Sequence, residues 1–192
     1  MINNWLMLCV PRTASTSLSK MLGLRADGGA GEHAENRYFG HMPAAMLRPR
    51  FGAKWDEMFT FGFARNPWDR LVSIAARINP RVLASKDTFY AWMTTGCQGQ
   101  DGGTSFATGG TPITRPCSEF LLPCKYVGKY ETLAYDTTVI CRVLGLEKVP
   151  EWRHDEQCEH KPYTEYYDAR SREWVNWYYH TDIVNFGYRF GG

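Results

Sequence analysis

The sequence lacks a long apolar run and a large excess of charge of either sign. The apolar run from Trp5 to Val10 is too short for the core of a signal peptide, and far too short to span a bilayer. We therefore expect a soluble, cytoplasmic protein with no membrane contact. The formal net charge of +2 argues against a general nucleic-acid binder, which would carry a basic face or tail. We expect no nucleic-acid partner, while a local basic site for one anionic ligand stays open.

The sequence also lacks a CxxC pair. A disulfide framework is not expected in a chain of this kind. One subset has the side chains that bind zinc, but its spacing matches no tight ligand pattern, so free thiols are the competing interpretation and we expect no metal. That subset is Cys117, Cys124, His154, Cys158 and His160.

No internal repeat and no linker divide the chain. Its 192 residues predict a single domain over residues 1–192. The stretch 96–116 is rich in glycine, threonine and serine, and we expect it to be a long mobile loop. The segment 24–36 is a second expected loop.

Two short apolar strands are each followed at once by a helix. We predict a strand over 4–10 with a helix over 15–22, and a strand over 59–64 with a helix that begins at Pro67 and ends at Asn79-Pro80. This pattern predicts an α/β domain whose central, mostly parallel sheet is flanked by helices. Further expected elements are a short helix after Pro43, a helical turn over 89–93, a strand end at 126–128, a helix over 133–144 and a largely helical, aromatic stretch over 163–190.

The turn after the first strand has the composition of a phosphate-binding loop. Small residues let the backbone approach a ligand, hydroxyl groups add donors, and the following helix presents unpaired N–H groups. The pattern GxxxxGK[ST] is absent, so this is not a Walker A loop. The competing interpretation is an ordinary capped helix start. The residues are Pro11, Arg12, Thr13, Ala14, Ser15, Thr16 and Ser17.

A second segment, 61–73, also joins a strand to a helix. Arg65 lies at the carboxyl end of the strand, where open α/β sheets bind ligands, and its guanidinium can hold a phosphate with two hydrogen bonds. Asn66 is a good N-cap, and Ser73 lies further along the helix. The alternative is that Arg65 pairs with an acidic residue and that Arg70 or Asp69 is a surface charge.

Together the two segments resemble those of sulfotransferases that use 3′-phosphoadenosine 5′-phosphosulfate (PAPS), in the carbohydrate-type, Golgi-sulfotransferase-like branch. The first resembles the 5′-phosphosulfate loop, and the second the 3′-phosphate element Arg-[Asp/Asn]-Pro-Trp-x-Arg-x-x-Ser. The segments 126–133 and 178–188 are similar to two further patterns of that branch. The resemblance implies a P-loop-like three-layer fold and an enzyme that transfers a sulfuryl group from PAPS to a hydroxyl, leaving PAP (adenosine 3′,5′-bisphosphate).

The resemblance also assigns roles and exposes two departures. Residues 11–17 would bind the 5′-phosphate end of PAPS, Arg65 and Ser73 the 3′-phosphate, and Arg12 would stabilise charge on the sulfuryl group. The family usually has lysine at Arg12 and glycine at Ala14; the alanine implies a turn that avoids positive φ there. No metal is required.

His41 is the candidate general base, because histidine suits proton transfer at neutral pH and its Gly-His setting ahead of the second strand resembles that of the catalytic histidine in the carbohydrate branch. The alternative is a loop histidine with a structural hydrogen bond. Glu32, His33 and Glu35 are the reserves. His160 and Lys161 fall where family members often have another donor-contacting segment. The acceptor is expected to be a glycan or a small molecule with a hydroxyl group. Basic residues that would attract an acidic acceptor, or simply face solvent, are Arg48, Arg50, Lys54 and Arg115.

Two other functions remain open. One is a small ATP-dependent kinase, against which the missing Walker lysine argues. The other is a non-catalytic module that binds PAP or another nucleotide, which Arg12 and Ala14 keep open.

Overall fold

A three-stranded parallel sheet lies at the centre of the chain. The computed structural model describes residues 4–24, 41–99, 112–146 and 159–192. Strands β1 (Trp5–Leu8), β2 (Phe59–Ala64) and β3 (Tyr126–Lys129) pair in the order β1-β2-β3. Leu8 is opposite Gly62, and Ala64 is opposite Lys129. The carboxyl ends of the strands therefore meet at one edge of the sheet.

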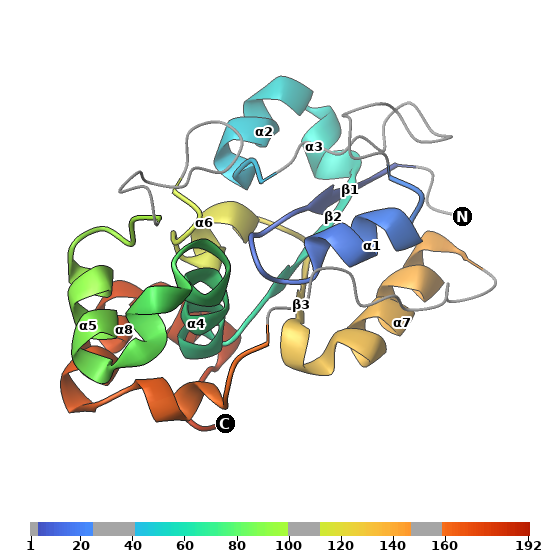
Figure 1. Cartoon of the computed structure of the whole chain (residues 1–192). Coiled ribbons are helices and arrows are strands. Elements are labelled where there is room, and N and C mark those ends of the chain that lie inside the picture. Colours follow the sequence, from blue (N-terminus) through green and yellow to red (C-terminus); the bar gives the residue numbers. More distant parts are fainter. Residues whose placement is uncertain (1–3, 25–40, 100–111, 147–158) are drawn as a thin grey trace.

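The sheet carries helices on both faces, because successive side chains of a strand point to opposite sides. Leu6 and Leu8 pack into one buried cluster with α2, α4, α5, α6 and α8. Trp5 and Met7 pack into a second cluster with α1 and α7. Figure 1 shows α1 near α7, and α4, α5 and α8 grouped apart from them. The mixed α/β class with a helix-flanked parallel sheet is confirmed.

The helices of the described residues are α1 (Ser15–Met21), α2 (Ala44–Phe51), α3 (Lys54–Glu57), α4 (Pro67–Ile78), α5 (Lys86–Thr94), α6 (Cys117–Leu121), α7 (Leu133–Leu144), α8 (Ala169–Tyr178) and α9 (His180–Phe186). Short 3-10 turns cover Pro80–Ala84, Tyr130–Thr132 and Tyr163–Tyr166. Among these helices, none combines the length and the apolar character that crossing a membrane requires.

The strand-to-helix units have the predicted bounds to within a residue or two. The strand 59–64, the helix from Pro67 to Ile78 and the helix 133–144 match, and the α7 C-cap Gly145 has a φ of 75°. The turn expected at 89–93 is the centre of a longer helix, because Ser85 caps it and extends it toward the N-terminus. Helices α3 and α6 were not predicted. Most of the expected loops at 24–36 and 96–116 lie outside the described residues.

Gly62 permits the close approach of β1, β2 and α6. A Cβ atom at Gly62 would lie 2.6 Å from the Leu8 carbonyl oxygen and would also overlap the side chain of Leu121. Only glycine fits this point without moving the backbone.

Candidate functional site

The turn after β1 is held in a conformation that its residues do not favour. Arg12 has a φ of 65° and Ala14 a φ of 61°, both in the left-handed region. The prediction that Ala14 keeps this turn at negative φ is therefore wrong. Ala14 is the N-cap of α1 and its carbonyl accepts the first helical bond, from the Leu18 N–H at 3.0 Å. Surrounding contacts outweigh the cost of about 1–2 kcal/mol for each such residue.

The hydroxyl groups of the turn divide into two sets. Thr13 is buried and donates its hydroxyl to the Val10 carbonyl at 3.0 Å, so it closes the turn rather than facing a ligand. Ser15 and Ser17 are buried in the first turn of α1, and Thr16 is half-buried. Ala14, the N-cap of α1, makes no side-chain cap hydrogen bond. The start of α1 therefore lacks the capping side chain at its N-cap that the competing interpretation, an ordinary capped helix start, would supply.

The second segment places Arg65 directly after β2 and before α4. Asn66 has the predicted role of N-cap: its side-chain oxygen accepts from the Trp68 N–H at 3.1 Å and the Asp69 N–H at 3.5 Å. Because β1 and β2 are parallel neighbours, Arg65 reaches the turn after β1. Its Nη1 donates to the Arg12 carbonyl at 3.1 Å.

Arg65 is only 7% exposed and is bound on several sides. Its Nε and Nη2 each lie 2.8 Å from Asp69 Oδ2, and its guanidinium stacks 4.1 Å from the centre of the Tyr130 ring. The alternative that Arg65 pairs with an acidic residue therefore holds in this structure. Of its five N–H groups, one on Nη1 and one on Nη2 have no partner in the described parts of the chain.

The two segments meet directly. Arg12 Nε donates to Ser73 Oγ at 3.1 Å, and Ser73 is buried on α4. Arg70 Nε donates to the Pro11 carbonyl at 2.9 Å. The alternative interpretation, in which Arg70 is a surface charge, does not hold, because the residue is 0% exposed. The structure thus brings together Pro11, Arg12, Arg65 and Ser73 at the carboxyl edge of the sheet.

His41 lies beside the same turn. Its Nδ1 is 3.0 Å from the Cys9 carbonyl oxygen at the end of β1. A carbonyl can only accept, so Nδ1 carries the proton and the lone pair of the neutral ring is on Nε2. In that tautomer Nε2 is the nitrogen that can take a proton. The reserve residues Glu32, His33 and Glu35 lie outside the described residues.

The segments 126–133 and 178–188 contact each other and the start of α4 through Glu131. Glu131 Oε1 accepts from the Asn66 N–H at 2.6 Å, and its Oε2 accepts from the Tyr188 hydroxyl at 3.2 Å. Burial, together with the neighbouring Glu131 carboxylate, raises the pKa of Tyr188 well above its usual range. Glu131 therefore joins the start of α4 to the end of the chain.

Sequence reasoning missed Asp69 and Tyr130 as partners of Arg65. Asp69 lies in the first turn of α4, close in sequence to Arg65 just ahead of the helix, and this closeness was available as a signal. Nothing in the sequence pairs Tyr130 with Arg65, because that contact depends on β3 lying beside β2. His160 Nε2 lies 3.9 Å from Asp69 Oδ1, whereas Lys161 is exposed near Glu165.

The zinc hypothesis finds no support in the described residues, where no three His, Cys, Asp or Glu side chains are placed to hold a metal. Burial raises the pKa of Cys117 and of Cys124 to about 12, which disfavours the thiolate that zinc needs. His154 and Cys158 lie outside the described residues. Of the basic residues, Arg48 pairs with Asp56 at 3.5 Å and Arg115 with Glu119 at 3.0 Å.

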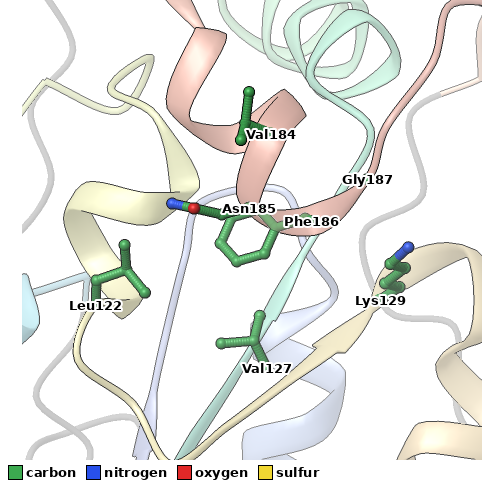
Figure 2. A pocket seen from close by; sticks show the side chains of 7 residues that line it. All are labelled: Leu122, Val127, Lys129, Val184, Asn185, Phe186 and Gly187. Carbon is green, nitrogen blue, oxygen red and sulfur yellow. The ribbon is translucent and has the colours of Figure 1, made fainter.

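A pocket of about 700 Å³ lies between β3 and α9. Figure 2 shows Val127 and Phe186 on opposite sides of it, with Lys129 at its margin. None of the predicted site residues lines this pocket. Lys129 is the register partner of Ala64, so the pocket begins at the same sheet edge as Arg65.

No family model matches this chain, and a search of the curated proteins returned no match.

Proposed function

We propose that this protein is a PAPS-dependent sulfotransferase with a P-loop-like, three-layer fold. The observation that carries the proposal is the meeting of the two predicted phosphate-binding segments, through Arg12 Nε and Ser73 Oγ at 3.1 Å and through Arg65 Nη1 and the Arg12 carbonyl at 3.1 Å. Such convergence suits a nucleotide with phosphates at both ends. The carboxyl edge of a parallel sheet is where ligands of α/β domains bind.

The donor set fits an anionic ligand. Arg12 is half-buried beside the turn, and Arg65 keeps two N–H groups that have no partner among the described residues. Arg70 adds a buried positive charge directly behind Pro11. Guanidinium groups bind phosphate and sulfate oxygens strongly, and the burial of Arg65 and Arg70 limits screening of their charges by water. None of these three arginines needs a metal ion to hold such a ligand.

PAPS would supply an activated sulfuryl group, and the residues of this chain would position it and its acceptor. Residues 11–17 hold the 5′ end, while Arg65 and Ser73 hold the 3′-phosphate. Arg12 neutralises charge that develops at the sulfuryl oxygens and on the leaving phosphate oxygen. His41 Nε2 takes the proton of the attacking hydroxyl, with Nδ1 fixed by the Cys9 carbonyl. The acceptor is a glycan or small molecule.

A second candidate is a module that binds PAP or another nucleotide without turnover, and Arg12 favours it. Arg12 stands where the family that the sequence resembles usually has lysine, it cannot lose its proton, and its Nε is already bound to Ser73 Oγ at 3.1 Å. The two candidates make the same prediction for binding and opposite predictions for catalysis.

The test is release of PAP from PAPS in the presence of a panel of sugars and simple alcohols. We expect PAP release that depends on the acceptor and that falls at least about a hundredfold in His41→Ala, which is typical of a lost general base. His180→Ala is the matched control, because His180 is exposed on α9. Binding of PAP without any turnover would support the module. Turnover that survives His41→Ala would remove His41 from the mechanism.

A further inference from the structure

Arg70 is a buried cation: it is 0% exposed, and among the described residues no carboxylate forms an ion pair with it. Its guanidinium donates instead to backbone carbonyls: Nε to Pro11 at 2.9 Å, Nη1 to Arg115 at 2.9 Å and Nη2 to Ile113 at 2.7 Å. A buried charge is costly, and methionine or leucine would fill the same space without that cost. The carbonyl contacts therefore point to a role other than core packing.

The Pro11 carbonyl has a special place in the turn. It belongs to the peptide unit that precedes Arg12, and the Arg12 carbonyl belongs to the peptide unit that follows. Arg70 holds the first and Arg65 Nη1 holds the second at 3.1 Å. The backbone rotation between these two units is the φ and ψ of Arg12, whose φ of 65° is disfavoured for a residue with a Cβ atom. Such a conformation persists only where its surroundings over-determine it.

We propose that Arg70 is a positioning residue that acts through Arg12. Together with Arg65 it fixes the two peptide planes on either side of Arg12 and so directs the Arg12 side chain toward Ser73. The effect of Arg70 on sulfuryl transfer rests on the proposed function, since Arg12 is the residue assigned there to the sulfuryl group. The holding of the turn by Arg70 is a property of the folded chain alone.

The Nη1 and Nη2 atoms of Arg70 link the turn to the segment that precedes α6. Ile113 and Arg115 lie just before α6, directly after a stretch outside the described residues. A planar fork can reach carbonyls on opposite sides at once, which a lysine ammonium on a flexible stem cannot. Arg70→Lys therefore keeps the charge and removes the geometry, so it separates the two contributions.

The first experiment needs no ligand. Hydrogen exchange of the backbone amides over residues 9–17 is measured in wild type, Arg70→Lys and Arg142→Lys, the last an exposed arginine on α7 that serves as the matched control. We expect exchange in this segment to rise at least tenfold in folded Arg70→Lys and to stay unchanged in Arg142→Lys. Unchanged exchange in folded Arg70→Lys overturns the proposal.

Should Arg70→Lys fail to fold, the wild-type protein supplies the readout. The Arg70 Nε–H, followed by nitrogen NMR, should exchange at least tenfold more slowly than that of Arg48, whose side chain is 53% exposed. Equal exchange rates at the two arginines overturn the proposal, because a guanidinium held by backbone carbonyls must protect its protons.

The second experiment tests the action through Arg12. PAP affinity is measured in a cycle of Arg70→Lys, Arg12→Ala and the double variant. We expect Arg70→Lys to weaken binding about tenfold in the wild-type background and less than twofold beside Arg12→Ala. Equal weakening in both backgrounds overturns the coupling. If exchange over 9–17 rises in Arg70→Lys but the wild-type protein binds no PAP, the positioning of the turn by Arg70 stands and only the sulfotransferase proposal is refuted.

Discussion

Asp69 limits the charge that Arg65 offers to a ligand, and removing its charge should strengthen anion binding. Both Nε and Nη2 of Arg65 lie 2.8 Å from the same oxygen, Asp69 Oδ2. In Asp69→Asn one amide oxygen can still accept both bonds, so Arg65 should keep its orientation while the negative charge disappears. The side chains are 8% and 19% exposed, so solvent screens their charges only in part.

The size of the effect follows from Coulomb's law. A phosphate on the outer N–H groups of Arg65 would lie about 7 Å from the Asp69 carboxylate, and an effective dielectric constant of about 40 gives roughly 1 kcal/mol per charge. Affinity for PAP should therefore rise about fivefold in Asp69→Asn. Thermal stability should fall, because Arg65 loses a charge-assisted partner worth about 1.5–3 kcal/mol.

The assay is calorimetric titration with PAP at two salt concentrations, with the gain larger at low salt. Asp168→Asn is the matched control: it removes the same charge from the N-cap of α8, where asparagine caps almost equally well. Weaker or unchanged PAP binding in Asp69→Asn, with normal binding in Asp168→Asn, would refute the assignment of Arg65 to a phosphate.

The remaining predictions concern stability and reactivity. Gly62→Ala should lower the free energy of unfolding by about 3 kcal/mol in urea denaturation, because its Cβ atom would overlap the Leu8 carbonyl; an unchanged midpoint would contradict this. Glu131→Gln should lower it by about 1.5 kcal/mol, since the Asn66 N–H loses a charged acceptor; equal stability would show that the contact contributes nothing. Hydrogen bonds from Ser171 hold the pKa of Asp168 below its usual range, so its stabilising effect is present above pH 4 and is lost as the pH falls; the stability difference between wild type and Asp168→Asn should shrink on acidification, and a constant difference would count against it. Burial raises the pKa of Cys9 to about 12, so mass spectrometry after treatment with a thiol reagent at pH 8 should find it unmodified until the protein is denatured.

The strand-to-helix units were predictable because their signals are local. Asn66-Pro67 marks a helix start by itself, and the alternation in β2 marks a buried strand. The direct contact of Arg12 with Ser73 was not predicted, because it depends on β1 and β2 being parallel neighbours, which bring the segments that follow them to one edge of the sheet.

Other features of the site depend on tertiary contacts that a sequence does not display. The left-handed φ of Ala14 is disfavoured for a residue with a Cβ atom, and the contacts that Arg65 and Arg70 make with the turn help to outweigh that preference. The burial of Arg70 was missed because its carbonyl partners lie in distant segments that carry no charge pattern. The stacking of Tyr130 on Arg65 depends on the sheet order.

The most direct test of the account is calorimetric titration of the wild-type protein with PAP, beside adenosine 5′-monophosphate and magnesium ATP. We expect micromolar binding of PAP that weakens by about 1.5–3 kcal/mol in Arg65→Ala. The monophosphate, which lacks the 3′-phosphate, should bind more weakly and should not respond to Arg65→Ala. A folded protein that binds no PAP, or that binds magnesium ATP in its place, would contradict the assignment of this site to PAPS.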